Sequence, residues 1–111
     1  VLGRYMPPPA GLQSPSLWGS EPHLKALFGE RAAAIAITPR QFTFRYRSAA
    51  HFVEVFRTWY GPVHKAFGAL PPEQAAALER DMIELFEGAN RGGKASFVAP
   101  SEYLEVVVAR R

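Results

Sequence analysis

The sequence contains no cysteine among its 111 residues. A disulfide framework, a thiol nucleophile and a Cys-based metal site are therefore excluded. No apolar run approaches the roughly 20 residues that cross a bilayer, so we expect no membrane partner. The segment from Val1 to Gly11 lacks the charged start and the apolar run of a signal peptide. A cytoplasmic location is the default expectation.

Strong charge of either sign is also missing. Thirteen Lys and Arg side chains oppose ten Asp and Glu side chains, which gives a formal net charge of +3. An excess this small is common in ordinary enzymes and does not indicate nucleic-acid binding. The three histidines, His23, His51 and His64, do not lie at metal-ligand spacing. We therefore expect neither a nucleic-acid partner nor a metal site.

The composition that remains is typical of a globular protein. Hydrophobic residues make up 48% of the chain, aromatic residues 13% and charged residues 21%, which excludes a disordered or fibrous protein. A chain of this length can bury roughly two-thirds of the surface that its unfolded form exposes. We expect residues 1–111 to form a single domain.

Residues 1–19 are predicted to form a loop or lid segment. Three prolines, Pro7–Pro9, end the short helix that opens the chain because they cannot supply helical amide donors. The residues that follow are rich in Pro, Ser and Gly, yet they include Leu12, Leu17 and Trp18. Such large apolar groups predict that the loop packs against the rest of the protein.

Residues 20–111 are predicted to form a unit of helix, strand, helices and strand. Ser20 is a suitable N-cap for a short helix that ends near Gly29. Apolar side chains then alternate with small or polar ones from Ile35 to Tyr46, which predicts a long strand. A break or bulge is expected at Pro39, since proline is not tolerated inside a β-ladder.

The end of this strand carries two arginines between aromatic residues. Phe44 and Tyr46 alternate with Arg45 and Arg47, a pattern that also occurs in sheets that stack RNA bases. The sequence words of an RNA-binding sheet are absent, and alternation alone predicts one dry face and one wet face. We favour this second interpretation.

Three helical segments are predicted next. Ser48 caps the first, and a Gly61–Pro62 pair breaks it before the second begins. The apolar stripe of the first comprises Phe52, Val53, Phe56, Trp59 and Tyr60. The regular spacing of Phe52, Phe56 and Trp59 favours core packing over a binding site.

The third helix starts at Pro71–Pro72, carries Leu78 and Met82 on its apolar stripe, and ends near Asn90 to Gly93, where the two glycines predict a cap and a turn. A final strand is predicted from Tyr103 to Ala109. Its centre is apolar on both faces, as in a strand from the middle of a sheet. The order of elements predicts an α+β fold or the tail of an α/β sheet.

Several short sequence motifs, taken in order, resemble those of one protein family. They are Pro7-Pro8-Pro9, Leu17-Trp18-Gly19, Leu27-Phe28-Gly29, Phe42-Thr43-Phe44-Arg45-Tyr46, Phe56-Arg57-Thr58-Trp59-Tyr60-Gly61-Pro62 and Glu102-Tyr103-Leu104-Glu105-Val106. Their order and spacing are similar to the C-terminal third of class I S-adenosylmethionine-dependent methyltransferases of the ubiquinone and menaquinone biosynthesis group. The resemblance covers nearly the whole chain.

The resemblance implies the C-terminal strands and capping helices of a Rossmann-like methyltransferase sheet. Ile35 to Tyr46 would be the sixth strand of seven, Tyr103 to Ala109 the seventh, and the helices between them an insertion over the substrate pocket. The family binds S-adenosylmethionine through a Gly-rich turn after its first strand, and no such turn exists here. The chain would then hold no cofactor and no catalytic residue, and would be inactive alone.

Trp18, Tyr60 and His64 are the candidate substrate-binding residues. A helix break at Gly61–Pro62 can turn Tyr60 and His64 toward a pocket, and the resemblance places that segment over a small organic acceptor. Each residue also has a structural interpretation, as a loop anchor for Trp18 or a plain solvated group for His64. We expect all three to share one surface depression.

A function from another class remains open. The chain would equally serve as a stand-alone ligand-binding or dimerisation module, with an exposed sheet edge and an apolar loop as its working surfaces. Both hypotheses predict a homo-oligomer, and a dimer is the simplest closed form.

Overall fold

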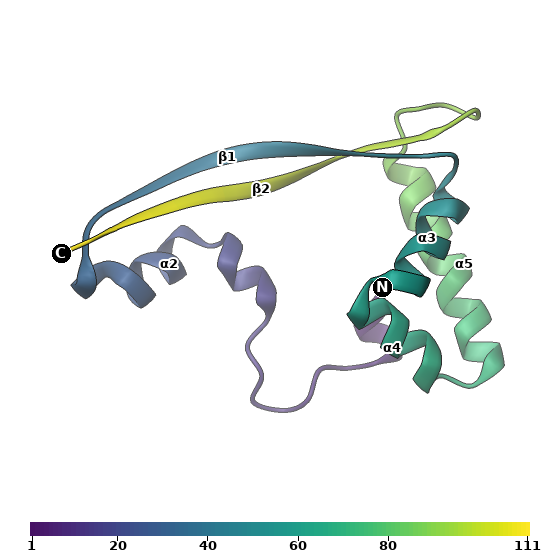
Figure 1. Cartoon of the computed structure of the whole chain (residues 1–111). Helices are drawn as coiled ribbons and strands as arrows, with labels where there is room; N and C mark the ends of the chain where they lie inside the picture. Colours follow the sequence, from purple (N-terminus) through teal and green to yellow (C-terminus); the bar gives the residue numbers. More distant parts are fainter. The chain divides into compact units, whose positions relative to one another are not determined.

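The computed structural model describes all residues 1–111, and its elements make an α+β fold (Figure 1). In chain order they are α1 (Leu2–Tyr5), the 3-10 turn η1 (Pro15–Gly19), α2 (Glu21–Phe28), the 3-10 turn η2 (Gly29–Arg31), β1 (Ala32–Tyr46), α3 (Ala49–Trp59), α4 (Gly61–Ala69), α5 (Pro72–Ala89) and β2 (Phe97–Arg110). The two strands pair with each other in one two-stranded sheet. Their pairing is antiparallel, because the start of β1 meets the end of β2. No helix combines the length and apolarity that a membrane span requires.

Local sequence signals set the helix boundaries, and most of them act as expected. The Ser20 hydroxyl accepts a hydrogen bond from the amide of His23 at 3.5 Å, and the Ser48 hydroxyl accepts one from the amide of His51 at 3.0 Å. Each serine thus satisfies one amide that the first helical turn leaves without a partner. The predicted break at Gly61 is confirmed, since α3 ends at Trp59 and α4 begins at Gly61.

Both strands are longer than the sequence suggested. The strand β1 runs through Pro39 without interruption and begins at Ala32 rather than Ile35. A proline can lie in this strand because a two-stranded sheet consists only of edge strands. The strand β2 begins at Phe97 instead of Tyr103 and has a single partner, so within this chain it is not the central strand that its apolar faces suggested.

The turn between α5 and β2 depends on the side chain of Asn90. Its Nδ2 group donates to the carbonyls of Gly93 and Ser96, both at 3.0 Å, and its Oδ1 accepts from the amides of Gly92 and Val98. Asn90 is also the C-cap of α5. The expected glycine cap is therefore wrong: Asn90 is the C-cap residue, and the glycines form the turn that follows, which the Asn90 side chain holds.

The chain forms two compact units. The first, called the helical unit, comprises Val1–Pro9 and Thr43–Ala99, and the second, called the ribbon unit, comprises Ala10–Phe42 and Pro100–Arg111. Both strands contribute residues to both units. The prediction that residues 1–111 form a single domain, in which residues 1–19 are a loop or lid segment, stays a prediction.

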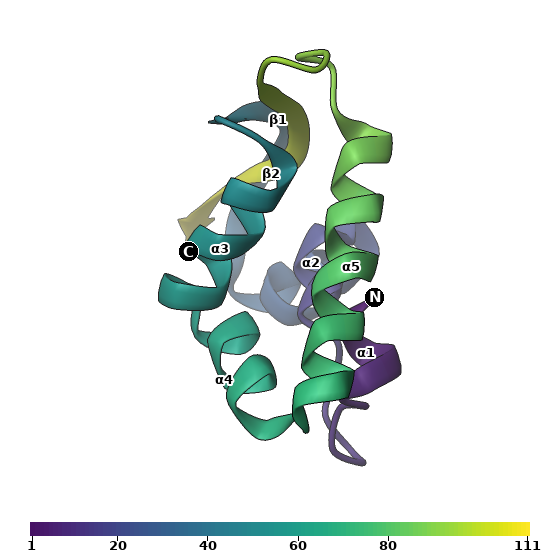
Figure 2. The same ribbon diagram turned by 90° about the vertical axis from the view of Figure 1, so that its right-hand side faces the viewer.

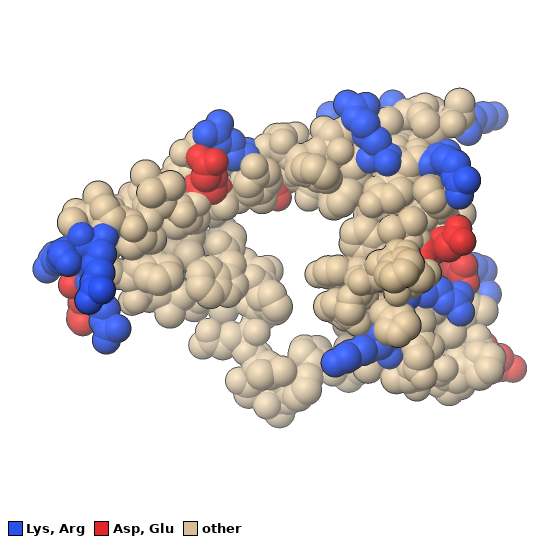
Figure 3. Space-filling view, in the orientation of Figure 1, with Lys and Arg blue, Asp and Glu red and all other residues tan.

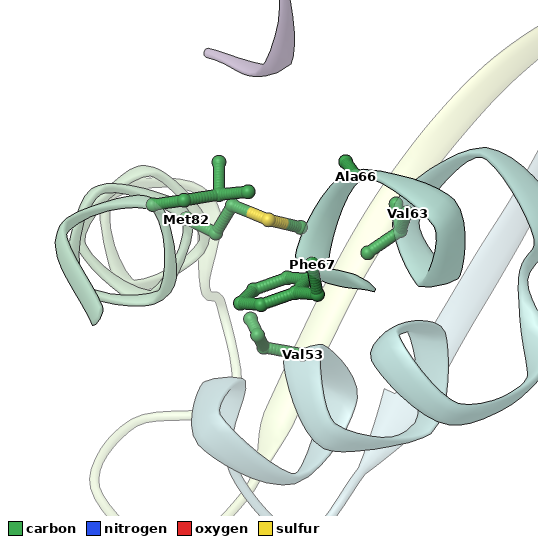
Figure 4. Packing of buried hydrophobic residues seen from close by; sticks show 6 residues of the cluster. Val53, Val63, Ala66, Phe67 and Met82 are labelled. Atoms are coloured by element: carbon green, nitrogen blue, oxygen red, sulfur yellow. The ribbon is translucent and has the colours of Figure 1, made fainter. Parts of the chain in front are cut away.

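In the helical unit α3, α4 and α5 lie against one another (Figure 2) and share one cluster of buried apolar residues. Val53, Val63, Ala66, Phe67 and Met82 point toward one another in Figure 4. Leu78 belongs to the same cluster and is fully buried. The short helix α1 packs against this cluster through Val1, Leu2 and Tyr5.

An aromatic cluster joins these helices to the near ends of the strands. The ring of Phe52 is 5.1 Å from the ring of Phe97 and nearly parallel to it, 4.8 Å from Tyr46 and 4.7 Å from Phe86. Tilted and edge-to-face pairs of this kind add to the stabilisation from burial alone. The predicted dry face of Phe44 and Tyr46 is confirmed, since both are half-buried while Arg45 is exposed.

The ribbon unit buries less. Its two buried apolar side chains are Leu24 and Ala32. The expectation that the whole apolar loop packs inward is wrong for Leu12, which is 67% exposed. The Pro and Gly residues around Leu12 form neither helix nor strand, so no regular element directs this side chain toward a core.

We expect Leu78→Ala to lower the free energy of unfolding by about 2–5 kcal/mol, because it leaves a cavity inside the helical unit. Leu85→Ala is the matched control on the same helix. Leu85 is 53% exposed, so its truncation should change stability by no more than about 0.5 kcal/mol. Urea unfolding followed by circular dichroism measures both. An equal loss of stability in both variants would contradict the burial of the α5 face that carries Leu78.

The phenol of Tyr5 is expected to titrate late. Its hydroxyl donates a 2.9 Å hydrogen bond to Asp81, and this bond, with burial and the carboxylate charge, raises the pKa of Tyr5. The protonated phenol is favoured in the folded chain, so its stabilisation is complete below about pH 10 and is lost as the pH rises through the raised pKa.

Asp81→Ala should return the pKa of Tyr5 toward its ordinary value, whereas Glu84→Ala on the next turn should not. The absorbance of the phenolate, taken as a difference from Tyr5→Phe at each pH, isolates this one tyrosine. An unchanged titration in Asp81→Ala would contradict the assigned hydrogen bond.

Candidate functional site

The corner between α3 and α4 is built around Tyr60. This residue is extended, with φ −90° and ψ 109°, and is at once the C-cap of α3 and the N-cap of α4. Its amide donates to the carbonyl of Phe56, and its carbonyl accepts from the amide of His64 at 2.8 Å. Pro62 lies in the first turn of α4, where its missing N–H has no helical role. The two helices thus turn at one residue.

A surface hollow of about 320 Å³ lies on this corner. Its lining residues are Arg57, Thr58, His64, Phe67 and Gly68. A side-chain Cβ at Gly68 would meet no atom within 4 Å, so the space beside this glycine is open. The hollow combines a cation, an imidazole and a hydroxyl with one aromatic ring, the mixture of apolar and polar groups that small-molecule sites use.

Arg57 holds one side of the hollow in place. Its guanidinium carbon lies 4.7 Å from the centre of the Phe67 ring, and its Nη1 is 3.2 Å from a carboxylate oxygen of Glu79 on α5. Stacking over the ring and pairing with a carboxylate both suit the planar guanidinium. About half of the Arg57 side chain remains exposed, so part of its positive charge faces the solvent.

His64 presents one ring nitrogen for binding. Its Nδ1 lies 3.0 Å from the carbonyl oxygen of Arg57. A carbonyl only accepts hydrogen bonds, so Nδ1 carries a proton and, in the neutral ring, Nε2 is left as an acceptor. This arrangement can accept a hydrogen bond from a hydroxyl or an amine of a bound molecule.

The three predicted site residues differ in where they lie. His64 lines the hollow, whereas Tyr60 lies beside it, 51% exposed, with its ring 5.1 Å from the ring of Phe56. Trp18 belongs to the ribbon unit, is 59% exposed, and has its ring 6.3 Å from that of Phe28. The grouping of all three residues in one depression stays a prediction.

The interpretation of the α3 stripe as core is wrong for one residue. Phe52 is buried and Phe56 half-buried, but Trp59 is 82% exposed. Trp59 is the last residue of α3, and the buried residues of this helix, Ala49, Phe52 and Val53, all lie in its first half. Periodicity alone does not indicate where the packing partners of a stripe end.

Sequence reasoning missed Arg57 and Thr58 as lining residues. The spacing of seven residues between Arg57 and His64, about two helical turns, places two side chains on one side only of a continuous helix. The break at Gly61 interrupts that helix, so the spacing gave no usable signal for Arg57. Thr58 is held by a 2.8 Å hydrogen bond to the carbonyl of Glu54.

A second hollow, of about 620 Å³, lies between α1 and α5 in the helical unit. Its lining residues are Val1, Arg4, Asp81, Glu84, Leu85, Gly88 and Ala89. Two of its charged groups neutralise each other, since Arg4 lies 3.3 Å from Asp81, which also accepts from Tyr5. We favour the hollow at the α3–α4 corner because it contains the predicted site residue His64.

Iodide should quench the fluorescence of Trp59 efficiently, because this side chain is largely solvated. Trp18→Phe leaves Trp59 as the sole tryptophan, and Trp59→Phe leaves Trp18. We expect the first variant to be quenched more steeply than the second, since Trp59 is the more exposed. Short-wavelength emission with little quenching from Trp59 would support the original core interpretation.

No family model, no curated protein and no solved structure matches this chain. A proposal for the function therefore rests on the order of the short sequence motifs and on the geometry of the α3–α4 corner.

Proposed function

We propose that this chain is the substrate-side C-terminal part of a class I S-adenosylmethionine-dependent methyltransferase that acts on a small organic acceptor. The order of the sequence words from Pro7 to Val106 supports the family assignment. The hollow at the α3–α4 corner is the proposed binding place for part of the acceptor.

The connection between the two strands is the observation that carries this proposal. The strands β1 and β2 are neighbours in the sheet, and three helices are inserted between them in the chain. Helices inserted between two strands provide a surface that is free to bind a ligand while the strands extend the sheet. This is the arrangement that the sixth and seventh strands and the cap of the proposed enzyme require.

Three of the lining residues have a role in binding the acceptor. The ring of Phe67 offers an apolar surface, and Nε2 of His64 accepts a hydrogen bond from the acceptor. The exposed part of the Arg57 guanidinium attracts a negatively charged or electron-rich group. These residues bind and orient the acceptor.

Methyl transfer also needs the donor to be held in line with the acceptor. Holding two reactants in the right geometry supplies up to about 7–11 kcal/mol of the barrier reduction. The Gly-rich turn that the family uses for its donor does not occur in this sequence. Alone, the chain is therefore proposed to be inactive.

We expect calorimetric titration of this chain with S-adenosylmethionine to give no saturable heat, since the donor-binding turn is missing. Saturable binding at a micromolar concentration of S-adenosylmethionine would contradict the proposal that this chain lacks the donor-binding part of the enzyme.

The coding sequence immediately upstream of Val1 tests the family assignment. An apolar strand that ends in a Gly-rich turn, within about 100–200 residues, establishes the parent enzyme. A stop codon or an unrelated domain in that place overturns the proposal.

In that longer enzyme, His64→Ala should raise the KM for the acceptor about tenfold through loss of one hydrogen bond, with the KM for the donor unchanged. His23→Ala, in the ribbon unit, is the matched control and should change neither constant. Equal effects of both substitutions would remove His64 from the site.

The alternative function is a stand-alone ligand-binding or dimerisation module. The exposure of Tyr103, Val107 and Val108 on β2 favours it, because these are large apolar side chains on a strand with one free edge.

A further inference from the structure

We propose that a second copy of this chain binds the free edge of β2, so that two β2 strands pair antiparallel about a two-fold axis at Val106. The result is a four-stranded sheet in the order β1, β2, β2 and β1. This inference concerns a different surface from the hollow at His64 and belongs with the stand-alone module, because in the proposed methyltransferase the same edge of β2 would pair with other strands of the parent sheet.

The free edge of β2 is long and continuous. From Ser101 to Arg110 every residue of β2 has a backbone N–H, since the only proline of the strand is Pro100. Ten residues in a strand span about 33 Å. The other strand is less suitable, because Pro39 removes an N–H from the middle of β1.

The ribbon unit has one half-covered face and one exposed face. The Nη2 of Arg40 is 3.0 Å from a carboxylate oxygen of Glu105, which places even-numbered residues of β1 and odd-numbered residues of β2 on the same face. The opposite face carries the half-buried side chains Ile35, Ile37, Leu104 and Val106. With a two-fold axis through a residue of β2, each face of the sheet in one chain is continuous with the same face of the sheet in the partner.

Charge complementarity selects the register. Glu102 and Arg110 are both exposed, and neither forms an ion pair within the chain. With the axis at Val106, Glu102 lies directly opposite Arg110 of the partner subunit. Symmetry forms this pair twice, and cross-strand pairs of opposite charge stabilise a sheet. The blue side chains at the end of the ribbon where the C-terminus lies are visible in Figure 3.

Neighbouring registers lose these pairs. An axis at Glu105 places Glu102 opposite Val108 of the partner subunit, and an axis at Val107 places Arg110 opposite Leu104 of the partner subunit. With the axis at Val106, Leu104 also faces Val108 of the partner subunit. This contact covers Val108, which is 37% exposed in the single chain.

A cysteine at the axis tests the register directly, because the chain has no cysteine of its own. In Val106→Cys the two new thiols lie directly opposite each other, with Cβ atoms about 4.5–5.5 Å apart, a separation from which small local shifts allow a disulfide. In Leu104→Cys, the matched half-buried control, the corresponding positions are about 13 Å apart. We expect mild oxidation to cross-link the first variant and not the second.

Charge exchange tests the same register without covalent chemistry. Glu102→Arg and Arg110→Glu each place like charges opposite each other twice. Either change should raise the dimer dissociation constant about tenfold, and the double variant should return it to within about threefold of the original. Sedimentation equilibrium measures these constants, and circular dichroism verifies the fold. Glu54→Lys and Lys65→Glu, exposed positions on α3 and α4, are the controls and should leave the constant unchanged.

A strict monomer up to about 100 μM, the weak-binding range for such contacts, would overturn the proposal. Equal cross-linking of Val106→Cys and Leu104→Cys would overturn the register, as would a double charge variant that stays as weak as the single ones. Loss of the dimer in the controls would assign the effect to net charge rather than to the β2 edge.

Discussion

The ring of Phe52 lies where α3 and α5 meet the near ends of both strands, and the architecture of the helical unit depends on it. It stacks on Phe97 of β2 and contacts Tyr46 of β1 and Phe86 of α5. The aromatic cluster thus packs the near ends of both strands against α3 and α5. A second apolar cluster, which begins at Val53 next to Phe52, packs α3, α4 and α5 together.

Much of this fold could be predicted from the sequence, because its boundaries are set by local chemistry. Ser20 and Ser48 cap their helices through bonds that span three residues, and the break at Gly61 requires no tertiary contact. The extent of β2 could not be predicted in the same way, since its start is held by Asn90 from across a turn. The exposure of Trp59 likewise depends on where its neighbours end, which a periodic stripe does not encode.

The residues of the candidate site also differ in whether a local sequence signal or a tertiary contact identifies them. His64 could be predicted to face a hollow because it follows a helix break, which is a local signal. Arg57 could not be ranked as a site residue, because its importance comes from Glu79 and Phe67, which lie on other helices. Trp18 was predicted as a site residue because it is a large apolar residue in a loop rich in Pro, Ser and Gly, and because of the family resemblance. In the ribbon unit its side chain is exposed.

The long ribbon joins parts of the chain that are far apart in sequence. Arg40 and Glu105 are separated by 65 positions, and the Arg111 side chain reaches the carbonyl of Ala32 across 79. The bonds within α3, α4 and α5 close over a few residues and need little loop ordering. Closing a long loop costs entropy before its contacts form, so non-local pairing is slow. We therefore expect α3, α4 and α5 to form before β1 and β2 pair along their full length.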